Sequence, residues 1–183
     1  MNRFRVWFGC ILMFLAGNTY AGVFETSLGF SYSRSAYNGG SYSVTQSWNG
    51  ALGYYLTQDS QVQFSYQDSL NSEFVPNVQD IKYRDRVYSM NFLYHLFSEG
   101  AAVRPFLRFG VGQLNRDATG TYQGGFSPPG RLDQVTVISG FGLKFKLSSR
   151  FGLRLDGTSY LTGGSIATWK DNFNVALGGS FYF

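Results

Sequence analysis

The sequence predicts an all-β protein: an eight-stranded antiparallel up-and-down transmembrane β-barrel. Three observations lead to this fold class. Eight segments alternate apolar residues with small or polar ones at a period of two, as strands with two unlike faces do. Long and short connections between these segments alternate strictly, which indicates hairpins whose long loops all lie at one end. Only 14% of the 183 residues are charged while 19% are aromatic, which is little charge for a soluble domain.

The first 21 residues are predicted to be a secretory signal peptide. Arg3 and Arg5 precede the apolar stretch Val6–Ala16, and small residues at positions 19 and 21 suit cleavage after Ala21. The apolar stretch has 11 residues, too few for a helix across a hydrocarbon core of about 30 Å. The mature outer-membrane barrel domain is therefore predicted to span residues 22–183.

The predicted strands follow in chain order, with the main apolar positions of each in parentheses. The first four are Val23–Ser33 (Phe24, Leu28, Phe30), Tyr42–Leu56 (Val44, Trp48, Leu52), Gln61–Gln67 (Val62, Phe64, Tyr66) and Tyr88–Leu96 (Met90, Phe92, Tyr94). The last four are Val103–Gly112 (Leu107, Phe109), Val135–Lys146 (Val137, Phe141, Leu143), Phe151–Leu161 (Leu153, Leu155) and Phe173–Phe183 (Val175, Leu177, Phe181). Short connections are predicted at 57–60, 97–102 and 148–150, and long loops at 34–41, 68–86, 115–132 and 162–172.

The composition of the two strand faces distinguishes a membrane barrel from a soluble one. The apolar face is nearly uncharged and concentrates its aromatics toward the strand ends, as the interfacial girdles of a membrane barrel do. The other face mixes Gly and Ser with a few charges, which suits a narrow lumen. A soluble ligand-binding barrel needs a solvated outer face, and the polar face here has too few charges for that.

The polar face also predicts a lumen charge cluster near the periplasmic ends of the strands. It consists of Glu25, Arg108, Lys144, Arg154 and Asp156. Unpaired charges in such a narrow space are costly, so we expect these groups to pair and close the lumen. Arg104 and Lys146 are expected at the periplasmic mouth instead, as solvated charges.

The chain resembles the family of small OmpA/OmpX-like outer-membrane barrels. The run Arg104–Gly112 looks like a strand common in that family, and the last residues are similar to its barrel-assembly signal. Gly178, Phe181 and Phe183 match this signal, whereas Ala176 replaces its usual polar first residue. The resemblance implies the bacterial (Gram-negative) outer membrane, lipid and lipopolysaccharide as neighbours, and assembly by the barrel-assembly machinery.

Candidate catalytic and metal-binding residues are few. The single histidine, His95, lacks the Ser two residues later that a lipid-deacylating barrel would need, so it is interpreted as a lumen residue. Cys10 leaves with the signal peptide, and no cofactor or metal site is expected. Four carboxylates of the 68–86 loop are interpreted as solvated and not as a calcium site: Asp68, Glu73, Asp80 and Asp85.

The predicted function is that of a non-enzymatic outer-membrane protein with a structural, adhesive or receptor-like role through its external loops. Two alternatives are a narrow, porin-like solute pore and a lipid-modifying enzyme. Without Arg3 and Arg5 the 15 basic residues become 13, against 11 acidic ones, a formal net charge of +2. A nucleic-acid partner is therefore not expected. The external partner is not indicated by any motif.

Overall fold

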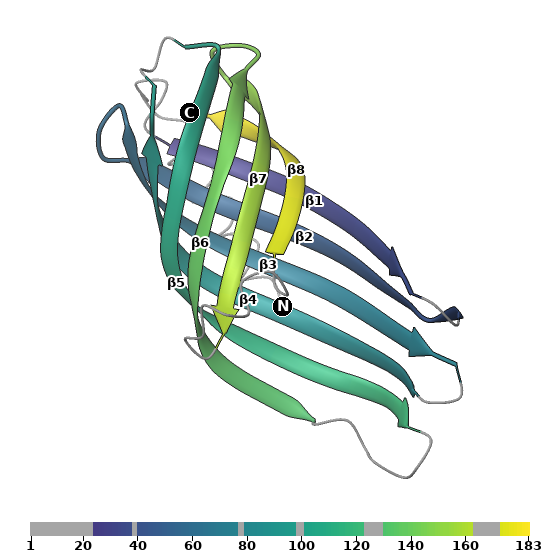
Figure 1. Cartoon of the computed structure of the whole chain (residues 1–183). Helices are drawn as coiled ribbons and strands as arrows, with labels where there is room; N and C mark the ends of the chain where they lie inside the picture. Colours follow the sequence, from purple (N-terminus) through teal and green to yellow (C-terminus); the bar gives the residue numbers. More distant parts are fainter. Residues whose placement is uncertain (1–23, 38–39, 77–78, 98–100, 123–129, 163–172) are drawn as a thin grey trace, which may run out of the picture.

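The computed structural model is a closed barrel of eight antiparallel strands, each paired with its neighbours in the chain (Figure 1). It describes residues 24–37, 40–76, 79–97, 101–122, 130–162 and 173–183. The strands are β1 (Phe24–Ala36), β2 (Tyr42–Tyr55), β3 (Ser60–Val75), β4 (Gln79–His95), β5 (Val103–Tyr122), β6 (Arg131–Lys146), β7 (Phe151–Thr162) and β8 (Phe173–Tyr182). The predicted fold class is confirmed. The predicted signal peptide lies outside the described residues.

The barrel closes where the first and last strands pair. This seam runs from Glu25 opposite Tyr182 to Phe30 opposite Leu177. Gly178 in β8 lies in the seam opposite Gly29 of β1, and a Cβ at Gly178 would lie 2.2 Å from the carbonyl oxygen of Leu28. Glycine at this position therefore permits the close approach of the two strands.

Short connections join β2 to β3, β4 to β5 and β6 to β7, close to where the sequence predicts them. We call the end of the barrel that carries them the turn end, and the opposite end the hairpin end. The hairpin end is uneven, because β5 has 20 residues whereas β8 has 10. The hairpins β3–β4 and β5–β6 consequently extend well past β8 (Figure 1).

The predicted long loops at 68–86 and 115–132 are wrong in extent, because most of these residues continue the two long hairpins. β3 extends to Val75 and β5 to Tyr122. Apolar alternation ends within these strands, but pairing continues through charged cross-strand neighbours, such as Arg84 with Asp68. A search for apolar residues on the outer face misses the part of a sheet whose outer face carries charged residues. The loop predicted at 34–41 is likewise shorter, because β1 continues to Ala36.

The barrel has a polar interior and an apolar exterior, as the strand faces predict. Leu28, Trp48 and Val135 are among the exposed apolar side chains on its outside, with 66–74% of their surface accessible. Buried polar residues line the inside, and Glu25, Ser47 and Gln61 are fully inaccessible. Such a surface is typical of a barrel that faces lipid. Within the described residues, no helix is long and apolar enough to cross a membrane.

Candidate functional site

Near the turn end, the lumen holds a carboxylate that accepts hydrogen bonds from side chains of four other strands. The Glu25 side chain projects inward from β1 and accepts hydrogen bonds from Gln61 (2.9 Å), Tyr55 (2.8 Å) and Ser180 (2.7 Å). Lys144 Nζ of β6 donates to the same carboxylate at 2.5 Å, and to Gln61 Oε1 at 3.0 Å. Every polar partner of Glu25 thus comes from another strand, so the carboxylate ties opposite walls of the barrel together.

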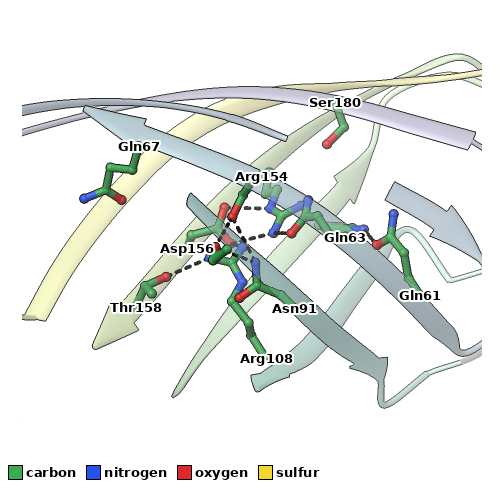
Figure 2. Close-up of polar contacts among 12 residues, drawn as sticks. Gln61, Gln63, Gln67, Asn91, Arg108, Arg154, Asp156, Thr158 and Ser180 are labelled. Carbon is green, nitrogen blue, oxygen red and sulfur yellow. Dashed lines mark hydrogen bonds and ion pairs between the residues drawn. The ribbon is translucent and has the colours of Figure 1, made fainter. Parts of the chain in front are cut away.

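A second layer lies beside the first, toward the hairpin end, and is centred on Asp156 of β7. Arg154 donates to both Asp156 oxygens, at 2.6 and 2.9 Å, and Arg108 Nη2 donates to Oδ1 at 2.7 Å. Figure 2 shows the two guanidinium groups converging on this carboxylate, with Thr158 bonded to Arg108 at 2.9 Å. Arg154 Nη1 also lies 3.6 Å from Glu25 Oε1, which joins the two layers.

The lumen charge cluster expected from the sequence is therefore assembled by the structure: Glu25, Arg108, Lys144, Arg154 and Asp156 lie in one connected network. Three cations face two carboxylates, so the cluster has one formal positive charge in excess. Buried ion pairs contribute to stability only where hydrogen bonds satisfy them fully. Both carboxylates have donors on both of their oxygens, and Glu25 accepts from four side chains where Asp156 accepts from two.

Aromatic side chains support the cluster from the turn end. Phe106 of β5 is 1% exposed, and its ring centroid lies 4.8 Å from the Arg154 guanidinium carbon and 5.6 Å from Lys144 Nζ. Cations over an aromatic face are attracted by the ring quadrupole. Sequence reasoning missed Phe106, although a large aromatic on the otherwise polar parity of its strand was a visible signal. It also did not single out Gln61, Gln63 and Tyr55.

His95 lies inside the barrel near the turn end, as the sequence predicts. Its Nδ1 lies 3.2 Å from the carbonyl oxygen of Asp59, and its ring packs against those of Tyr55 and Phe106, with centroids 5.6 and 5.8 Å away. The ring is 1% exposed. Tyr55 stacks its ring on His95, while its hydroxyl donates to Glu25 and accepts from Lys144, so the contact with His95 is one of ring packing.

The predicted position of Arg104 as a solvated mouth residue is wrong. Arg104 is 7% exposed and donates to the carbonyl oxygens of Gln58 (2.6 Å) and Phe97 (3.2 Å). These carbonyls belong to two neighbouring short turns, whose unpaired backbone acceptors the guanidinium satisfies. Lys146, the other residue expected at the mouth, is exposed.

On the side of the cluster toward the hairpin end, an apolar layer that the sequence did not reveal fills the lumen. It consists of Val87, Leu114 and Ile138, with Tyr160 packed against them. Beyond it, Arg116 donates to both oxygens of Asp85, at 2.7 and 2.6 Å. Apolar and paired side chains thus follow the charge cluster along the lumen toward the hairpin end.

The four carboxylates expected in one solvated loop are wrongly placed by the sequence, because all four lie on strands. Asp68 faces outward and pairs with Arg84, whereas Asp85 faces the lumen and pairs with Arg116. Within the described residues, no group of three His, Cys, Asp or Glu side chains could hold a metal ion.

The residues of the expected assembly signal lie along β8 and just after it. Gly178 occupies the seam with β1, and Phe181 and Phe183 form an edge-on pair with ring centroids 4.8 Å apart. The Phe183 amide donates to the Phe24 carbonyl at 3.0 Å. These residues therefore close the barrel, and their recognition by an assembly machinery stays a prediction.

The chain is similar to several known outer-membrane barrels. The family model of the OprF membrane domain matches residues 24–176. The N-terminal β-barrel domain of Pseudomonas aeruginosa OprF is 19% identical with a TM-score of 0.58, and the match covers 89% of this chain and 99% of that one. For Neisserial surface protein A these values are 13%, 0.57, 90% and 100%.

A third similar structure is Ail, the attachment invasion locus protein of Yersinia pestis. It is 17% identical with a TM-score of 0.56, and the match covers 88% of this chain and 99% of that one. Structures this distant in sequence establish the fold alone. No curated protein sequence matches the chain.

Proposed function

Because the chain belongs to the OprF membrane domain family, we propose that it is a non-enzymatic surface protein of the bacterial outer membrane with a structural, adhesive or receptor-like role. The observation that carries this proposal is the filled lumen. Charged, aromatic and apolar side chains occupy it in successive layers around Glu25, Asp156 and Leu114. A barrel filled in this way passes few ions, so the outside of the barrel carries the function.

The extended hairpin end is the part of this surface that an external partner would meet. In the proposed orientation the turn end faces the periplasm, and β3–β4 and β5–β6 project outward. The outward face of these hairpins carries ion pairs, among them Arg84 with Asp68 at 2.7 Å and Arg86 with Asp117 at 3.4 Å. On the side of these ion pairs toward the turn end, Tyr66 and Tyr88 pack against each other with their ring centroids 5.0 Å apart, as girdle residues at a membrane interface do. Lipid and lipopolysaccharide would surround this belt.

The role is tested in a deletion strain complemented with wild type or with a double variant, Arg84→Ser and Arg86→Ser. A structural role predicts that deletion increases detergent sensitivity and that both proteins restore resistance. An adhesive or receptor-like role predicts loss of binding to candidate surfaces, restored by wild type but not by the double variant. Lys146→Ser, at the opposite end of the barrel, is the control. Unchanged resistance and binding in the deletion strain would contradict the proposal.

A narrow solute pore is the second candidate, because the lumen is closed by ion pairs, which can exchange partners. Planar-bilayer recording separates the two. The wild type is expected to show almost no steady conductance, and Glu25→Ala, which leaves excess positive charge in the lumen, is expected to conduct anions. A stable open channel in the wild type would favour the pore. The buried surroundings of His95 give no support to the third candidate, a lipid-modifying enzyme.

A further inference from the structure

A small cavity lies inside the barrel beside the second layer of the lumen charge cluster. Its volume is about 20 Å³, and its lining includes Ser27, Gln63, Arg108, Arg154, Thr158 and Asn174. A space of this size holds about one water-sized species. The lining is predominantly polar, so the cavity is not one that would stay dry.

Among the described residues of this lining, three donors lack a hydrogen-bond partner, namely Gln63 Nε2, Arg108 Nε and Arg154 Nη1, and so does one acceptor, Asn174 Oδ1. Gln63 is 1% exposed, and its Nε2 has no hydrogen-bond partner among the described residues, while its Oε1 accepts from Arg154 at 3.4 Å. Arg108 bonds Asp156 and Thr158 through its two terminal nitrogens, but its buried Nε has none within the described part of the chain. Buried N–H groups are rarely left in this state, and the unpartnered donors outnumber the one unpartnered acceptor, so they indicate a species in the cavity that accepts hydrogen bonds.

The charge of the cluster indicates which acceptor fits. Within the described residues, Arg108, Lys144 and Arg154 form ion pairs with Glu25 and Asp156, which leaves one positive charge uncompensated in the buried lumen. Water satisfies donors but does not neutralise that charge, whereas an anion does both.

We propose that this cavity binds a single monovalent anion of about the size of chloride. The anion accepts from Gln63 Nε2 and Arg108 Nε and makes the lumen electrically neutral. It thereby completes the closure of the barrel, and its binding does not depend on the surface role proposed above.

Bromide locates the site directly. Crystals of the full-length barrel grown in sodium bromide are expected to show an anomalous peak within hydrogen-bond distance of Gln63 Nε2 and Arg108 Nε. Ordered water that bridges Gln63 and Asn174, without anomalous signal, would overturn the proposal.

Stability provides the second test. The thermal unfolding midpoint in detergent is expected to be about 3–6 °C higher in chloride at ten times its dissociation constant than in gluconate at equal ionic strength. Gln63→Leu and Arg108→Met are each expected to abolish this difference. Arg116→Met is the matched control for Arg108, because it removes an inward arginine of the same strand that does not line the cavity. An equal chloride effect in all three variants, or none in the wild type, would contradict a specific site.

Discussion

The substitution Glu25→Gln tests how far the lumen network stabilises the barrel. Glutamine has nearly the same shape as glutamate, so the substitution removes the negative charge and creates almost no cavity. Lys144 and Arg154, whose side chains are both 3% exposed, then lose the carboxylate that lies 2.5 and 3.6 Å from them. Removing one partner of a buried ion pair costs about 3–5 kcal/mol. The unfolding equilibrium constant is therefore expected to rise by roughly a hundredfold to a few thousandfold.

Urea titration of the protein folded into phospholipid vesicles, followed by tryptophan fluorescence, measures this difference. Asp133→Asn is the matched control, because its partner Arg131 is exposed and the pair lies outside the lumen. The control is expected to cost at most about 1 kcal/mol. The double variant Glu25→Gln with Lys144→Met removes the unpaired ammonium and is expected to recover part of the loss. If Glu25→Gln costs no more than the control, the buried network does not stabilise this barrel.

Three further predictions concern the lipid face and the seam. Leu107→Arg places a charge on the outside of β5 and is expected to cost about 2–4 kcal/mol in vesicles; native stability would contradict the assignment of the faces. Gly178→Ala is expected to weaken the seam, seen as loss of the heat-modifiable gel form, because its Cβ would lie 2.2 Å from a backbone oxygen of β1. Gly179→Ala, whose Cβ would meet the Phe151 ring at 3.5 Å, should keep that form. Deletion of Phe183 is expected to reduce folded protein in outer-membrane fractions, and an unchanged yield would argue against an assembly role.

Apolar alternation predicts the extent of a strand only up to the point where charged pairs replace apolar residues on its outer face. In β3 and β4, alternation is clear where one face meets lipid, as at Phe64 and Met90. It disappears at Asp68 and Arg84, where the outer face is charged and a cross-strand ion pair joins the two strands. Such pairs leave no period in the sequence. The extent of the two long hairpins therefore became visible only once the strands were paired in register.

Strand number, the apolar exterior and the five members of the lumen charge cluster were determined by the sequence alone, whereas the inward positions of Arg104, Asp85 and Arg116 were not. A period of two assigns every residue of a strand to one face, and lipid allows almost no charge on its side. Which lumen residues contact one another was decided only by the closed barrel. Closure brings Glu25 within 2.5 Å of Lys144, which is 119 positions away, and places Phe106 and Gln63 beside the charged groups. Those contacts depend on barrel shear and side-chain packing, which no local pattern in the chain records.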